Sequence, residues 1–241
     1  MQNGGFVNKI QGVRLSVAKI HRHVFENPGY LPAIYENDEG YVRKVLIRSG
    51  EEDYLYNGPF KFIDENENLI DVSTVKRYIV DEGDYIYYNF IGNVKCIRAP
   101  LLLGAAVDTI WFYTDAYNAD AYAYKGLSIK EEWGSWTDGK ELKIYFLVDT
   151  DAPLINAKIN VSNAFYHPQR VTILVNGSEV YQEVVEGAQN IEFAFENSKT
   201  HIICLTMLLP DAVAPSEVMD SNDSRVLGLG LQTMTVSEAG K

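Results

Sequence analysis

Hydrophobic and polar residues alternate one by one along most of this chain, in short runs. Such alternation places successive side chains on opposite faces of a β-strand, while the spacing of an amphipathic helix is nearly absent. In the first half this pattern predicts strands at residues 12–20, 41–49, 52–57, 59–64, 74–80, 83–91 and 93–99. Clusters of Gly, Pro, Asn and Asp, which favour turns, separate them. Residues 16–25 also fit a short helix, so the first strand has two interpretations.

The second half has a clearer pattern. Strands are predicted at residues 141–148, 156–164, 170–175, 178–185, 190–196, 201–209 and 226–236. Asn176-Gly177 is typical of a two-residue hairpin turn, the strongest short hairpin signal. Seven short strands at this spacing predict an antiparallel β-sandwich or jelly roll. Residues 210–225, with two prolines, are expected to form a surface loop around one end of it.

The composition changes between residues 101 and 126, where Ala and Tyr become frequent. We place a domain junction near residue 120, which gives an N-terminal β domain of unknown type at 1–120 and a jelly-roll sandwich at 121–241. A chain of 241 residues is long enough for two such cores. The predicted class is therefore all-β, with two β domains.

Charge excludes some kinds of partner. Lys and Arg number 21 against 33 Asp and Glu, a formal charge of −12, which argues against nucleic acids and anionic membrane surfaces. The N-terminus lacks the apolar stretch of a signal peptide, and no apolar run approaches the roughly 20 residues that span a bilayer. We expect a soluble chain without membrane insertion. Its sixteen tyrosines suit half-buried strands and also surfaces that bind polar ring-shaped ligands.

Trp133 and Trp136 precede an Asp138-Gly139 pair and the apolar run 141–148. Asp-Gly is typical of a two-residue hairpin turn, which would pair the tryptophan segment with that run. Cross-strand partners share a face and successive residues alternate, so Trp133 is predicted on the core face and Trp136 on the polar face. On this register the two rings cannot form one continuous platform.

Two alternatives remain for these rings. A longer loop, or a strand interrupted at Gly134, would turn both the same way. An exposed Trp136 near Asp138 would suit a sugar, because an indole stacks on its C–H face while carboxylates accept its hydroxyl hydrogens. If another strand or the N-terminal half covers Trp136, its role is structural instead.

Three sequence elements together resemble a known family. They are "WGSWTDG", the "VNG" hairpin and "PSEVMDSNDSRVLG", and the resemblance covers residues 124 to 236. The matching residues are Trp133, Gly134, Trp136, Asp138 and Gly139, then Asn176 and Gly177, then Pro215, Glu217, Asp223, Arg225, Leu227 and Gly228. This pattern is similar to the C-terminal β-sandwich of bacterial glycosyltransferases and of membrane polysaccharide or phosphoglycerol transferases. One departure is "EVMDSND", where the family tends to have Leu-Gly after the Glu.

The resemblance implies a galactose-binding-like jelly roll that acts as a non-catalytic accessory module. It implies contact with a glycan or with a glycan-assembling enzyme, and a place in the bacterial cell envelope. It names no ligand and leaves residues 1–120 unexplained.

Two groups of polar residues are further candidates for ligand contact. Asp223 and Arg225 are two residues apart and share a face in an extended segment, where they form either a salt bridge that holds the long loop or a polar pair for sugar hydroxyls. Tyr166, His167 and Arg170 lie at a turn before a strand, and they either pack the turn or present a ring and a cation to a glycan.

No pattern of catalytic or metal-binding residues stands out. The chain has neither a G-x-S-x-G elbow nor a reactive-cysteine motif. His21 and His23 share a strand face, but spacing places no third ligand beside them. Cys96 and Cys204 lie in apolar runs and are expected to be buried thiols. We predict no cofactor, no metal and no enzymatic activity.

The predicted function is therefore a carbohydrate-binding or glycan-positioning module. Its candidate contact residues are Trp136, Asp138, Tyr166, His167, Arg170, Asp223 and Arg225. The alternatives are a structural module that docks to a catalytic partner or oligomerises, and an enzyme that modifies glycans.

Overall fold

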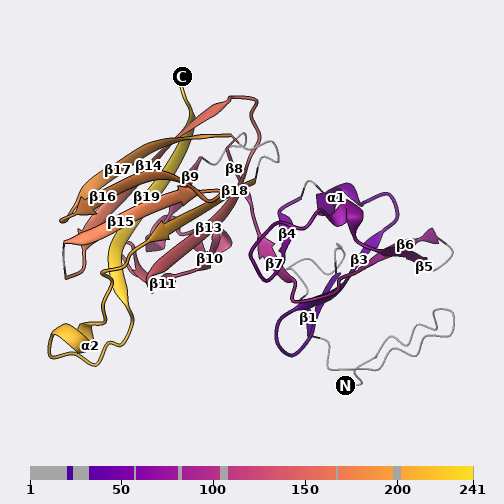
Figure 1. Cartoon of the computed structure of the whole chain (residues 1–241), viewed down its shortest axis with the longest axis horizontal. Helices are drawn as coiled ribbons and strands as arrows, with labels where there is room; N and C mark the ends of the chain where they lie inside the picture. The colour runs from indigo at the N-terminus through magenta and orange to yellow at the C-terminus, as the bar shows by residue number, and fades with distance from the viewer. Residues whose placement is uncertain are drawn as a thin grey trace. The chain divides into compact units, whose positions relative to one another are not determined.

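The computed structural model describes residues 21–23, 33–56, 58–80, 83–103, 108–166, 168–197 and 202–240. The chain divides into two compact units, Met1–Ile97 and Arg98–Lys241. Each unit has its own hydrophobic core. The described strands pair mostly antiparallel, which confirms the predicted all-β class (Figure 1).

The first unit is built on a five-stranded sheet with the order β1-β2-β3-β6-β5. Its strands are β1 (His21–His23), β2 (Ala33–Glu36), β3 (Val42–Arg48), β6 (Tyr85–Asn89) and β5 (Arg77–Val80). A second sheet pairs β4 (Phe60–Ile63) with β7 (Lys95–Arg98), and the 3-10 helix η1 covers Val72–Thr74. Val45, Ile47 and Ile86 alternate inward to fill the core, as the period-2 pattern predicts.

Among the described residues of this unit one predicted strand is wrong, and the strand predicted at residues 12–20 lies outside them. Residues 52–57 contain α1 (Asp53–Tyr56), a single helical turn that buries only Leu55. A short run with one inward-facing apolar residue fits a helical turn as well as a strand, so periodicity alone does not separate them. The turn is followed by Gly58, where a Cβ would lie 2.0 Å from the Tyr54 carbonyl oxygen.

The second unit is a sandwich of two sheets. The β13 sheet contains β10 (Ala123–Lys125), β13 (Glu141–Val148), β18 (Ile202–Leu208), β15 (Gln169–Val175) and β16 (Ser178–Val185), with β8 (Leu101–Leu103) beside β13. The β19 sheet contains β11 (Leu127–Lys130), β12 (Ser135–Asp138), β19 (Leu227–Glu238), β14 (Leu154–Ala164) and β17 (Gln189–Glu196), with β9 (Thr109–Trp111) beside β19. Short helices η3 (Thr114–Ala116), η4 (Ala119–Ala121) and α2 (Pro215–Val218) lie in the connections.

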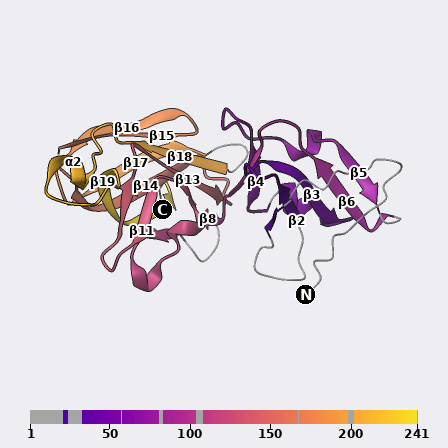
Figure 2. The same ribbon diagram turned by 90° about the horizontal axis from the view of Figure 1, so that it is seen from below.

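The strands of the sandwich can be followed in both views. In Figure 1, β19 runs from the α2 end of the sandwich to the C-terminus. In Figure 2, β16, β15 and β18 lie at the top of the sandwich and β11 at the bottom. The inner faces of the two sheets bury one continuous apolar core, to which β13 contributes Leu142, Ile144, Phe146 and Val148. This arrangement is the predicted antiparallel sandwich.

The Asn176-Gly177 hairpin is confirmed. Both residues have positive φ, 50° and 83°, as a two-residue turn of this type requires. The turn pairs Val175 with Ser178. The Asn176 side chain also accepts a hydrogen bond from the Cys204 backbone N–H at 2.8 Å, so the turn is tied to the neighbouring strand β18.

The predicted domain junction near residue 120 lies inside the second unit. Strand β8 pairs with β13 and strand β9 pairs with β19, so both belong to the sandwich. Ile110 and Phe112 are fully buried in its core. The change in composition near residue 101 therefore marks added strands of the sandwich.

The Asp138-Gly139 hairpin prediction is wrong. Strand β12 pairs with β11 and β19, whereas β13 pairs with β10 and β18 in the opposite sheet. The Asp-Gly turn therefore crosses from one sheet to the other. Gly139 adopts the φ of +110° that such a tight crossing requires, a conformation that Asp-Gly supplies equally well in a hairpin.

Three further predictions concern the two cysteines, the pair His21 and His23, and membrane-spanning segments. Cys96 and Cys204 are free thiols and only partly exposed; burial raises the pKa of the Cys96 thiol. The side chains of His21 and His23 lie outside the described residues. Across the described ranges, no helix combines the length and the apolar character needed to span a bilayer.

Candidate functional site

The inner face of strand β12 is polar. Ser135 and Thr137 are fully buried. The Ser135 hydroxyl donates to the Phe112 carbonyl at 2.8 Å, and the Thr137 hydroxyl accepts the Leu229 N–H at 3.0 Å. These short side chains thus satisfy backbone groups of neighbouring segments, as buried polar groups must be satisfied. They anchor β12 to β19 and to Phe112 without adding apolar volume.

Asp138 continues this backbone pairing at the end of β12. Its carboxylate accepts the Val226 N–H at 3.0 Å, and the next residue, Gly139, donates its N–H to the Val226 carbonyl at 2.7 Å. The side chain is partly exposed. Of the candidate contact residues, Asp138 is thus engaged mainly in holding the start of β19.

The outer face of β12 carries an aromatic cluster. Trp133 and Trp136 meet edge to face with ring centroids 5.2 Å apart, and Trp136 meets Phe165 in the same way at 6.0 Å. All three rings are partly exposed. The prediction that Trp133 lies in the core is therefore wrong, and the alternative in which both rings face the same way is correct. Edge-to-face contact is a preferred geometry for aromatic pairs.

Glycines make room for this cluster. A Cβ on Gly230 would lie 2.8 Å from the ring of Trp133, so only a glycine lets the indole rest on strand β19. A Cβ on Gly134 would lie 2.3 Å from the Leu231 carbonyl oxygen. The Gln232 side-chain amide donates to the Trp133 carbonyl at 3.2 Å. The two glycines and the two tryptophans form one packing unit on the outer surface of the sheet.

The third tryptophan lies on the same face. Ile110 on β9 points into the core, so its neighbour Trp111 points outward. Trp111 is the register partner of Thr233 on β19. All three tryptophans of the chain therefore lie along the outer side of β19, a surface that we call the tryptophan face. The sequence interpretation missed Trp111 because it treated this segment as a domain junction, although Ile110-Trp111-Phe112 already alternates.

A line of charged groups borders the tryptophan face. The Trp133 indole N–H donates to Glu131 at 2.8 Å, and Glu131 lies 3.6 Å from the Arg225 guanidinium. Arg225 in turn binds Asp223 at 2.6 Å and donates to the Ser128 hydroxyl at 2.9 Å. Hydrogen bonds from Arg225 lower the pKa of the Asp223 carboxyl. The structure thus contains the Asp223–Arg225 salt bridge that was one of the two sequence alternatives.

Tyr166 lies in the loop that follows β14, and Arg170 is the second residue of strand β15. Tyr166 is 60% exposed and has a φ of 47°, which is unusual for a bulky residue. Its ring lies 6.5 Å from that of Phe165, so it extends the aromatic cluster outward. Arg170 instead binds Asp211 through two guanidinium hydrogen bonds of 2.6 and 2.8 Å and one from its backbone N–H of 3.0 Å, and these lower the pKa of Asp211 to about 2. His167 lies outside the described residues.

A shallow groove lies on the same outer surface, across β17, β14 and β19. Its volume is about 520 Å³. The lining residues are Asn156, Ala157, Lys158, Glu192, Phe193, Thr235 and Ser237. Lys158 and Glu192 form an exposed ion pair at 3.0 Å. The sequence interpretation missed this groove because its members come from three strands that pair only in the folded chain.

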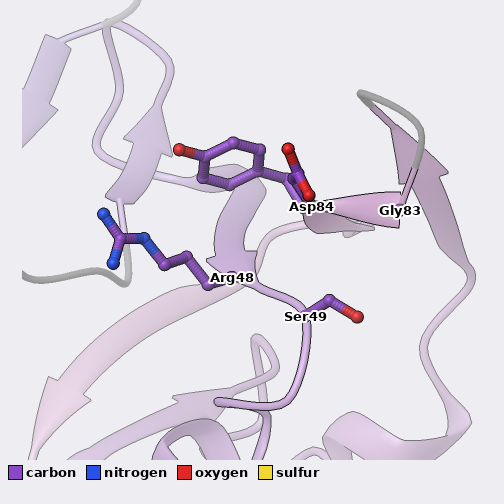
Figure 3. A pocket seen from close by; sticks show the side chains of 5 residues that line it. Arg48, Ser49, Gly83 and Asp84 are labelled. Carbon is purple, nitrogen blue, oxygen red and sulfur yellow. The ribbon is translucent and has the colours of Figure 1, made fainter.

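A second hollow, of about 400 Å³, lies in the first unit and is lined by Arg48, Ser49, Gly83, Asp84 and Tyr85. Figure 3 shows the side chains of Arg48 and Ser49 pointing in opposite directions. A ligand site requires polar groups that converge on one point. This hollow is therefore a weaker candidate than the tryptophan face. In the described part of the chain, no group of three or more His, Cys, Asp or Glu is placed to hold a metal ion.

Comparison with known proteins gives a family and several similar structures. A family 35 carbohydrate-binding module from an environmental isolate is 14% identical, with a TM-score of 0.33 over 58% of this chain and 93% of that chain. A CBM36-1 domain of a xylanase from the hindgut metagenome of Trinervitermes trinervoides is 12% identical, with a TM-score of 0.34 over 55% and 98%. A family 35 module from Clostridium thermocellum is 9% identical, with a TM-score of 0.32 over 52% and 96%.

No curated protein matches the chain. One family model matches residues 103–238, which is more than half of the chain and includes β9, the tryptophan face and the groove. The chain belongs to this family, described as Domain of unknown function (DUF7024).

Proposed function

We propose that the sandwich is a non-catalytic glycan-binding module. The observation that carries the proposal is the tryptophan face, on which all three tryptophans of the chain lie along one strand. The core does not need them, because Ser135 and Thr137 occupy the inner positions of β12. Large aromatic rings on an outer sheet surface, next to polar side chains, suit a ligand with both C–H faces and hydroxyl groups.

The charged border supports a binding role over a catalytic one. Glycoside hydrolysis requires a carboxylic acid that is protonated near neutral pH. The pKa of Asp223 is lowered by Arg225, so this carboxyl stays ionised and can only accept hydrogen bonds. Glu131 already accepts the Trp133 indole N–H. Glu131 is thus placed to orient the Trp133 ring, and both acids are placed to accept hydrogen bonds from sugar hydroxyls at the edge.

The exposed apolar side chains give little support to a docking module. In the described ranges the most exposed aliphatic and methionine side chains lie on separate segments of the chain: Ile79, Ile91, Ile129, Val184 and Met219. Partner surfaces are usually contiguous apolar patches. We further propose that the module serves a bacterial surface-polysaccharide system, beside a glycan-assembling enzyme. Support for this context is the motif pattern around Trp133, Asn176 and Arg225.

A glycan array followed by calorimetric titration tests the function. Wild type is expected to bind at least one envelope glycan, and Trp136→Ala and Trp111→Ala are each expected to lose at least tenfold in affinity, since each variant removes an indole ring on which a sugar can stack. Tyr54→Ala is the matched control, because Tyr54 is an exposed aromatic residue of the first unit. Absence of binding to every glycan, or equal losses in the control, would contradict the proposal.

A further inference from the structure

The tryptophan face and the groove belong to one continuous surface. Outward-facing positions of β19 run from Gly230, under Trp133, through Thr233, beside Trp111, to Thr235 and Ser237 in the groove. At about 3.3 Å per residue, this line is roughly 23 Å long. This length is several times the length of one sugar ring.

The two ends of this surface differ in chemistry. The Gly230 end offers indole rings, whereas the groove end offers side chains that both donate and accept hydrogen bonds, among them Asn156 and Thr235. Between them, Asn160 on β14 is the register partner of Thr233 and donates to Asn190 at 3.1 Å. Stacking platforms and amide or hydroxyl groups in one line match a chain of sugars, each with ring faces and hydroxyls.

The charge of this surface determines which kind of sugar chain it favours. Two cations along the surface have carboxylate partners: Lys158 binds Glu192, and Arg225 binds Asp223 and Glu131. The second unit as a whole, residues 98–241, contains 10 Lys and Arg against 19 Asp and Glu. A polymer of uronic acids or sugar phosphates would therefore meet net repulsion.

We propose that this surface binds a neutral, extended oligosaccharide, with one end on the tryptophans and the other in the groove of Asn156 and Thr235. The inference rests on the proposed glycan-binding function and adds the length and charge of the ligand. The groove is shallow and open, as suits a chain that lies along the sheet. Part of the oligosaccharide lies in it, and the remainder lies on the indoles.

The test is calorimetric titration of the full chain with neutral gluco-, manno- and xylo-oligosaccharides from disaccharide to hexasaccharide, and with oligogalacturonates of the same lengths. Affinity for at least one neutral series is expected to rise about tenfold or more with length, since longer chains reach the groove. The double variant Asn156→Ala/Thr235→Ala should remove this gain for the hexasaccharide and leave disaccharide affinity unchanged. Trp136→Ala should weaken both lengths.

Thr172→Ala, on β15 in the opposite sheet, is the control and should bind like wild type. Binding that is independent of length, binding unaffected by the groove variant, or tighter binding of oligogalacturonate would overturn this inference and leave the proposed function standing. Failure of every oligosaccharide and every array glycan to bind would overturn both.

Discussion

Strands β12 and β13, which flank the Gly139 turn, bury opposite kinds of side chain. β13 turns Leu142, Ile144 and Phe146 into the core, as an alternating strand should. β12 buries two hydroxyl residues and turns Trp136 outward. In β13 apolar volume stabilises the sandwich, and in β12 hydrogen bonds to β19 and to Phe112 do so.

This difference between the two strands points to the outer face of β12 as the functional surface. A tryptophan in β13 would fill the core, and its presence would need no further explanation. On β12 the core is closed without Trp136, so the indole is available to a ligand. The following changes probe this contrast between the inner and outer faces of β12, in order of decreasing expected effect.

Gly134→Ala should have the largest effect on stability. The new Cβ would lie 2.3 Å from the Leu231 backbone oxygen, so strands β12 and β19 must separate. We expect a loss of about 3 kcal/mol in the free energy of unfolding, measured by urea denaturation. Gly187→Ala is the control, because no atom lies within 4 Å of its Cβ. Equal stability of the two variants would contradict the close approach of the strands.

Thr137→Val tests the inner face of β12 with almost no change in volume. The Leu229 N–H would lose its acceptor in a site that is fully buried. An unsatisfied buried donor should lower the free energy of unfolding by about 2 kcal/mol. Thr235→Val, on the outer face of β19, should change it by less than about 0.5 kcal/mol. Similar losses in both variants would remove the distinction between the two faces.

Trp136→Ala tests the outer face. Loss of edge-to-face contacts with Trp133 and Phe165 should lower the free energy of unfolding by only about 1 kcal/mol, because these rings are partly exposed. Glycan affinity should fall at least tenfold in the same variant. A destabilisation larger than that of Thr137→Val would instead identify Trp136 as a core residue.

Asp211→Asn should have the smallest effect, because the Arg170–Asp211 pair is largely exposed and screened. We expect a loss below about 1 kcal/mol at neutral pH. The pKa of Asp211 is about 2 in the folded chain against a usual 3.8, so the pair contributes above pH 3.8 and loses its contribution as pH falls through 2. Denaturation of wild type and of Asp211→Asn across this pH range checks the prediction. If the difference between their free energies of unfolding grows as the pH falls, the prediction is contradicted.

Local patterns predicted much of the sandwich. The alternating run at residues 141–148 forms β13 with the same bounds, and Asn176-Gly177 forms the expected hairpin, since both depend on neighbours in sequence. The Asp138-Gly139 prediction failed because Asp-Gly permits the same local backbone whether the next strand pairs with the last one or joins the opposite sheet. Trp111 was missed because its strand, only three residues long, was interpreted as part of a domain junction.

The sequence by itself determined which segments are strands, which residues alternate and where the tight turns lie, because these follow from the conformational preferences of adjacent residues. Only the tertiary structure decided which face of β12 is inside. That choice depends on partners such as Leu229, which is 92 residues from Thr137 along the chain. Pairing over such distances brought three tryptophans and a polar groove to one surface, because it is the packing of the two sheets that selects the outer face.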